Sequence, residues 1–200
     1  MSVLVTKSAP DFTAKAVMPD GSVKGDFQLS KNFGPKGTVL FFYPLDFTFV
    51  CPTEIIAFDH RLDEFKKRGV NVIGVSVDSH WSHVAWRSTP LDKGGIGPIK
   101  YPIVSDLSKS IARDYDVLLG NEISLRGSFL IDAKGIVQHQ VVNSPSLGRN
   151  IDEMLRMVDA MQFNEEHGEV CPAGWNKGAK AMKANPDGVA SYLREHALAL

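Results

Sequence analysis

The sequence predicts an α/β fold built on a mixed sheet. Runs of apolar and β-branched residues at 39–43, 70–77, 128–131 and 136–142 have the length and composition of strands. Helical patterns lie between or after several of these runs, and such alternation is typical of α/β architecture. Residues 132–135 have turn chemistry and join the last two runs into an expected antiparallel hairpin, which makes the sheet mixed.

A helix is expected after the first strand. Four apolar residues recur at intervals of three or four and so share one helical face: Ile55, Phe58, Leu62 and Phe65. Pro52 suits the first helical position because its missing N–H would be unpaired there anyway. The basic stretch 66–68 followed by Gly69 suits the end. We therefore expect a helix over residues 52–68, with Cys51 at its N-terminus.

The run at residues 70–77 has the composition of a central strand that is covered on both faces. Together with the strand at 39–43 and the helix at 52–68 it predicts a βαβ unit with a right-handed crossover. Functional groups gather near the carboxyl ends of the strands in such units. Cys51 stands at this point of the unit.

The last part of the chain changes in character. A stripe of apolar residues predicts a helix over residues 148–163, packed on the sheet. Polar and glycine-rich sequence follows, and a final helix is expected within residues 189–200. We predict one domain over residues 1–163 and a C-terminal arm over 164–200, which packs on its own domain or on a neighbouring subunit because it lacks a core.

Composition excludes several classes of function. The chain has 22 Lys and Arg against 23 Asp and Glu, so it lacks the basic excess of nucleic-acid-binding proteins. Neither a secretory signal nor an apolar run of membrane-spanning length is found, so we expect a cytoplasmic protein without a membrane partner. In that reducing compartment a permanent structural disulfide between Cys51 and Cys171 is unfavourable.

A metal site is not expected either. Neither cysteine has a second cysteine or a histidine at the spacing of zinc ligands. His80 and His83 would share one face of a helix, but they form no complete ligand set with a neighbouring acid or cysteine. We interpret them as surface or core histidines.

Cys51 is the candidate nucleophile. Unpaired N–H groups and the dipole at a helix N-terminus stabilise an anion, and the thiolate is the reactive form of cysteine. Pro44 and Thr48 stand in the same loop, where a proline shields the sulfur and a hydroxyl can hold a small hydroxylic substrate. Arg126 precedes a strand that could lie beside the first and would stabilise the thiolate. The alternatives are a buried structural thiol, a turn-stabilising threonine and an ordinary surface arginine.

The stretch 42–54 resembles the active-site signature of the typical two-cysteine peroxiredoxins. The match continues through Arg126 and Gly127, through residues 143–149, and through 168–175, which resembles the resolving-cysteine segment of that family. The resemblance implies a thioredoxin-like fold and a peroxidase that reduces hydrogen peroxide and organic hydroperoxides in antioxidant defence. No metal, haem or flavin cofactor is implied.

The resemblance also assigns the site residues. Cys51 would attack the peroxide and become a sulfenic acid. Pro44, Thr48 and Arg126 would shape the pocket, and Glu54 would hold the arginine, although an ordinary first-turn helix acid is the alternative for Glu54.

The resemblance further implies an assembly and a reductant. Cys171 of the partner subunit would form a disulfide with Cys51, reduced by thioredoxin or a dedicated flavoprotein partner; an inert tail thiol is the alternative. Family members form homodimers and often rings of five dimers, with contacts that would involve residues 45–49 and 78–86. Residues 94–97 resemble a loop linked to over-oxidation, but Tyr192-Leu193 replaces Tyr-Phe, so we expect intermediate sensitivity.

Two other functions remain open from the residues. A thiol-disulfide oxidoreductase of the same fold normally carries Cys-x-x-Cys, but the position three after Cys51 is Glu54. A holdase chaperone is the other, alone or as a secondary activity of a peroxidase.

Overall fold

The computed structural model describes residues 3–199. Contacts divide the chain into two compact units, which meet between Ile151 and Asp152. Each unit is described by itself, and the domain boundary predicted at residue 163 stays a prediction.

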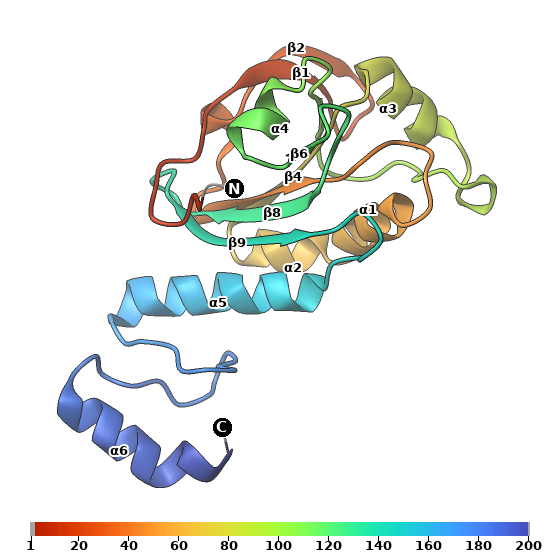
Figure 1. Cartoon of the computed structure of the whole chain (residues 1–200). Helices are drawn as coiled ribbons and strands as arrows, with labels where there is room; N and C mark the ends of the chain where they lie inside the picture. The colour runs from red at the N-terminus through yellow and green to blue at the C-terminus, as the bar shows by residue number, and fades with distance from the viewer. Residues whose placement is uncertain (1–2, 200) are drawn as a thin grey trace. The chain divides into compact units, whose positions relative to one another are not determined.

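The first unit is built on a mixed sheet, as the sequence predicted (Figure 1). Within the described residues the sheet has seven strands in the order β2-β1-β5-β4-β3-β8-β9. These strands are β1 (Thr13–Val17), β2 (Val23–Gln28), β3 (Gly37–Phe42), β4 (Val70–Ser76), β5 (Ile103–Ser105), β8 (Arg126–Ile131) and β9 (Val137–Asn143). A separate small pair is formed by β6 (Leu118–Leu119) and β7 (Ile123–Ser124).

Strand β3 lies near the middle of the sheet and places the functional loop. It pairs in parallel with β4 and antiparallel with β8. The predicted βαβ unit and the predicted hairpin of β8 and β9 are therefore confirmed. Because β8 runs opposite to β3, its first residue, Arg126, stands at the carboxyl end of β3.

The helix predicted over residues 52–68 is interrupted. Two helices, α1 (Cys51–His60) and α2 (Leu62–Lys67), meet at Arg61, whose φ of −99° and ψ of 3° depart from helical values. Cys51 is the first residue of α1, as expected. The remaining helical elements of the first unit are η1 (Ser30–Asn32), α3 (His80–Ser88), η2 (Leu91–Lys93) and α4 (Ser110–Asp114).

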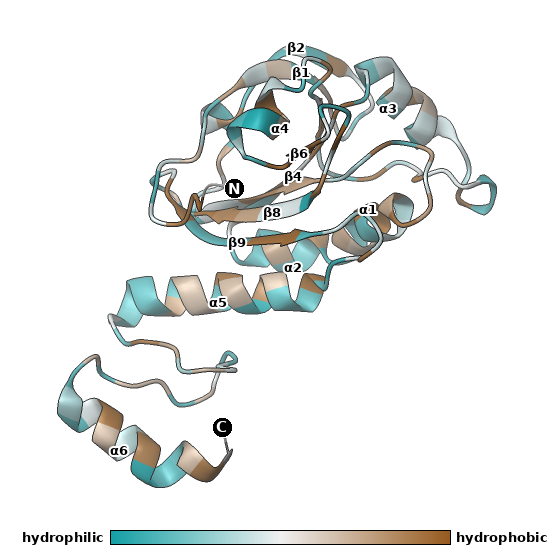
Figure 2. Ribbon diagram, viewed as in Figure 1, coloured by the Kyte–Doolittle hydropathy of each residue, from teal (hydrophilic) through white to brown (hydrophobic). Residues whose placement is uncertain are grey.

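The core of the first unit has a layer on each face of the sheet. On one face Phe42 packs with Tyr115 and Phe129, and on the other Phe41 stacks on Phe58 of α1. This alternation follows from the two-residue period of a strand. Figure 2 shows the central strands largely in brown, which marks apolar residues.

The second unit contains most of α5 (Ile151–His167), together with α6 (Pro186–His196) and η3 (Ala197–Ala199). The polar segment between α5 and α6 is held by contacts inside the unit: Arg156 donates to the Trp175 carbonyl at 2.9 Å, and the Trp175 ring lies 4.9 Å from that of Phe163. Asn185 caps α6, which buries none of its described side chains. The predicted last helix ends at Leu200, outside the described residues.

The described helices include none that is long and apolar enough to span a membrane.

Candidate active site

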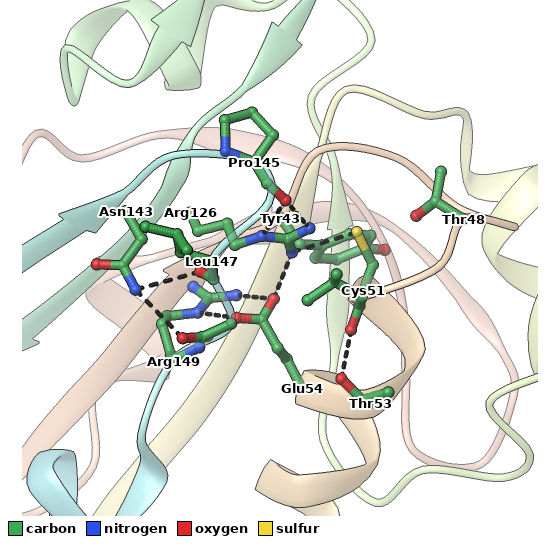
Figure 3. Close-up of polar contacts among 12 residues, drawn as sticks. Tyr43, Thr48, Cys51, Thr53, Glu54, Arg126, Asn143, Pro145, Leu147 and Arg149 are labelled. Atoms are coloured by element: carbon green, nitrogen blue, oxygen red, sulfur yellow. Dashed lines mark hydrogen bonds and ion pairs between the residues drawn. The ribbon is translucent and has the colours of Figure 1, made fainter.

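Cys51 occupies the first position of α1, just beyond the carboxyl end of β3 (Figure 3). Its side chain is fully buried. Pro52 follows at the start of the helix, and the Thr53 N–H donates to the Val50 carbonyl at 3.0 Å. This first-turn donor is therefore used within the backbone, and the sulfur takes its hydrogen bond from a side chain.

That side chain is Arg126. Its Nη1 donates to the Cys51 Sγ at 3.4 Å and to Glu54 at 2.5 Å, while Nε donates to the Pro145 carbonyl at 2.8 Å. The guanidinium is only 3% exposed. The structure thus brings together the cysteine predicted at a helix N-terminus and the arginine predicted before a strand beside the first.

Glu54 lies one helical turn after Cys51, and both its oxygens are used by arginines. Its Oε2 accepts from Arg126, and its Oε1 accepts from the Nε and the backbone N–H of Arg149, each at 2.9 Å. The Arg149 Nη2 completes a fork to Oε2 at 2.9 Å. Glu54 is therefore the bridge between two buried guanidinium groups.

Arg149 is a site residue that sequence reasoning did not single out. Its Nη1 donates to the Phe42 and Gly127 carbonyls at 2.8 and 2.9 Å, so it also ties β3 to β8. The available signal was its place in the stretch 143–149 that resembles the family. With two arginines and one glutamate, the buried cluster carries one excess positive charge, which an adjacent thiolate would neutralise.

Pro44 and Thr48 lie in the loop between β3 and α1. Pro44 is buried, and the Thr48 hydroxyl donates to the Leu45 carbonyl at 2.8 Å. The turn-stabilising contact is thus formed, and the lone pairs of the hydroxyl oxygen remain as acceptors for a substrate. In Figure 3, Thr48 and Arg126 lie on opposite sides of the Cys51 sulfur.

A buried polar cluster anchors this loop. The Tyr43 hydroxyl donates to Asp46 at 2.8 Å, and the Asp46 N–H donates to Asp78 at 2.9 Å. Burial raises the pKa of Tyr43 well above its usual value, so the phenol stays protonated and remains a donor. His83 lies 2.8 Å from Asp46 and is fully buried, which identifies it as a core histidine.

Histidine, cysteine and acidic side chains form no cluster of three or more suited to a metal ion anywhere in the described part of the chain.

Cys171 belongs to the second unit and is half-buried as a free thiol. Its Sγ lies 3.6 Å from the Ala160 carbonyl of α5. Burial raises the pKa of the Cys171 thiol, and the charge of Arg156 opposes this effect.

Comparisons with known proteins bear on the whole chain. The model of the AhpC/TSA family matches residues 5–140, and that of the C-terminal domain of 1-Cys peroxiredoxin matches residues 160–195. The chain belongs to the peroxiredoxin family. The enzyme is a thiol-dependent peroxidase, and the thioredoxin-like fold that the resemblance implied is confirmed.

Individual relatives cover almost all of this peroxiredoxin. Alkyl hydroperoxide reductase C of Helicobacter pylori is 60% identical over 198 residues, which are 99% of this chain and 100% of the relative. Peroxiredoxin-2 of Mus musculus is 52% identical over 96% of each chain. The crystal structure of reduced 2-Cys peroxiredoxin from Plasmodium vivax, 52% identical, superposes with a TM-score of 0.94 and covers 96% of this chain and 100% of its own.

Proposed function

We propose that Cys51 is the peroxidatic cysteine of this peroxiredoxin. The Cys51 thiolate attacks the terminal peroxide oxygen and the O–O bond breaks. The departing oxygen takes up a proton and leaves as water or an alcohol, and Cys51 becomes a sulfenic acid. The observation that carries this assignment is the Arg126 Nη1, which donates to the Cys51 Sγ at 3.4 Å from within a buried Arg–Glu–Arg cluster.

The neighbouring residues take distinct roles in this step. Arg126 stabilises the thiolate and donates to the peroxide oxygens as charge develops on them. The Thr48 hydroxyl oxygen accepts a hydrogen bond from the O–H of the hydroperoxide and aligns its O–O bond with the sulfur. Pro44 shields the thiolate from water and larger reactants. Glu54 does not touch substrate in this scheme and positions Arg126.

Cys171 of the partner subunit is the proposed resolving cysteine. Its thiolate attacks the sulfenic sulfur of Cys51, and hydroxide leaves and is protonated to water, so the two cysteines end as an intersubunit disulfide. Since Cys51 is fully buried, the first turn of α1 must open before this step. Cys171 lies in a segment whose helix α6 buries no described side chain, which suits a group that must move.

The reductant and the assembly complete the proposal. A dithiol protein, thioredoxin or a dedicated flavoprotein partner, reduces the disulfide in the cytoplasm. The subunits form homodimers that join into a ring of five dimers through residues 45–49 and 78–86. These two segments expose Phe47, Phe49 and Trp81, of which Phe49 is 92% exposed. Large exposed apolar side chains are typical of an interface.

The test is stopped-flow oxidation by hydrogen peroxide, with non-reducing electrophoresis of the products. Wild type should react rapidly and give a disulfide-linked dimer, and Cys51→Ser should not react. Cys171→Ser, the matched cysteine control, should oxidise as fast as wild type and stop at the sulfenic acid. Slow oxidation of Cys51 in wild type would contradict the proposal, as would a dimeric disulfide in Cys171→Ser.

A further inference from the structure

The ring of Phe41 forms a fixed surface beneath Arg149, one of the two arginines of the candidate site. Phe41 lies on β3 and is fully buried. Its ring stacks on Phe58 at 4.3 Å with an angle of 18° between the planes, and Tyr101 meets it edge-on at 5.8 Å. Packed on these neighbours, the ring has little freedom to shift.

The guanidinium of Arg149 lies over this ring, with its Cζ 5.1 Å from the ring centroid. The edge of the same guanidinium is occupied by hydrogen bonds to Glu54 and to backbone carbonyls of β3 and β8. The hydrogen bonds fix the position of the guanidinium within its plane, whereas contact with the ring limits the tilt of that plane. A cation over an aromatic face is also attracted to it, most strongly away from water.

A chain of contacts then leads to the sulfur. Arg149 holds Glu54 by a two-point fork, and Glu54 holds Arg126 at 2.5 Å. We propose that Phe41 is a positioning residue of the peroxidase. Its ring sets the plane of the Arg149 guanidinium, and Arg149, through Glu54, orients the Arg126 guanidinium toward Cys51. This inference rests on the proposed role of Cys51.

Gly74 provides the space for the ring. It faces Phe41 across the parallel pair of β3 and β4, and a Cβ at this position would lie 3.1 Å from the Phe41 Cζ. That approach is closer than ordinary van der Waals contact, so an alanine would move the ring by a few tenths of an ångström. Gly74→Ala therefore changes the orientation of the Arg126 guanidinium without removing any side chain from the chain of contacts.

The experiment compares two reactions of Cys51 in a Cys171→Ser background, where the second thiol is absent. Oxidation by hydrogen peroxide depends on the thiolate and on the aim of Arg126 at the peroxide oxygens, whereas alkylation by iodoacetamide depends on the thiolate and on access. Phe41→Leu should lower the ratio of the two rate constants roughly five- to tenfold. Gly74→Ala should lower it in the same direction. The control Phe129→Leu removes another fully buried ring from the other face of the sheet and should leave the ratio unchanged.

A double-mutant cycle shows whether Phe41 acts through Arg149. Arg149→Lys removes the planar guanidinium, so adding Phe41→Leu to it should lower the ratio no further. Equal effects of Phe41→Leu and Phe129→Leu, or full additivity with Arg149→Lys, would overturn the inference while leaving Cys51 as the peroxidatic residue. Slow peroxide oxidation in the parent itself would overturn both.

Discussion

Single residues of the site differ in how far sequence could predict them. The position of Cys51 at a helix N-terminus follows from the local spacing of apolar residues. Arg126 could be predicted as a site residue only through the resemblance to the family, since an isolated arginine before a strand does not indicate a function. Arg149 meets Glu54 across 95 positions of sequence, so only the fold brings them together. No local pattern encodes such a contact.

At the residue scale, the environment of Cys171 predicts a pH dependence of disulfide formation. Burial raises the pKa of its thiol, so the thiolate is a minor species near neutral pH and its fraction rises about tenfold per pH unit below that pKa. After a single peroxide pulse, the rate of dimer formation should rise in this way between about pH 6 and about pH 8. Quenched samples on non-reducing gels measure it.

Substitution of Arg156 provides a test of this effect, because the charge of Arg156 lowers the pKa of Cys171 and so opposes the effect of burial. Arg156→Gln should slow disulfide formation at a given pH and leave the initial oxidation of Cys51 unchanged, while Arg156→Lys keeps the charge and should stay near wild type. A rate of disulfide formation that is independent of pH would contradict this account.

At the scale of elements, the predictable strands were those with a run of apolar and β-branched residues, and β9 is among them although most of it is not buried. Strands β3 and β8 are buried along their whole length; β3 has an apolar run over residues 39–42, and β8 has one over residues 129–131. Strand β2 exposes four of its six residues and contains Gly25 and Asp26, and β5 has only three residues, so neither carries a strand pattern. Strand β5 pairs with β1 and β4, which are distant in the chain, whereas β2 pairs with the preceding strand, β1. The break at Arg61 was likewise hidden, because the apolar spacing continues across it.

Two glycines in the loop after α3 allow a test of packing at the same scale. They differ: Gly94 has a φ of +79° and open space where a Cβ would stand, whereas a Cβ on Gly95 would lie 1.8 Å from the Thr89 carbonyl oxygen. Gly94→Ala should cost about 1 kcal/mol of left-handed strain. Gly95→Ala should cost about 2 kcal/mol or more, because backbone must move.

Thermal unfolding of both variants and wild type at one protein concentration measures this difference. Gly95→Ala should have the lower Tm, with Gly94→Ala between it and wild type. The reverse order would show that the close approach to Thr89 does not limit the loop.

On the scale of the whole molecule, candidate site residues and exposed apolar side chains lie in one short loop of the chain. The same loop that carries Pro44 and Thr48 inside exposes Phe47 and Phe49 outside. Large apolar side chains left in water are unfavourable, so a contact that covers them is stabilised by their burial. Assembly and the geometry of the peroxide pocket are therefore expected to be coupled through this one segment.

Trp81 provides the test of the proposed ring. Its side chain is 68% exposed at the start of α3, in one of the two segments proposed to form contacts between dimers. An arginine there would bring a charge into each such contact, and loss of a buried aromatic anchor costs roughly 2 kcal/mol, or about thirtyfold in the dissociation constant. Trp81→Arg should therefore move the population from rings to dimers in sedimentation velocity, most clearly at low protein concentration.

Val23→Lys, which adds a charge at a 39% exposed apolar residue on strand β2, should leave the distribution as in wild type. Rings of unchanged stability in Trp81→Arg would place the contact between dimers elsewhere on the molecule.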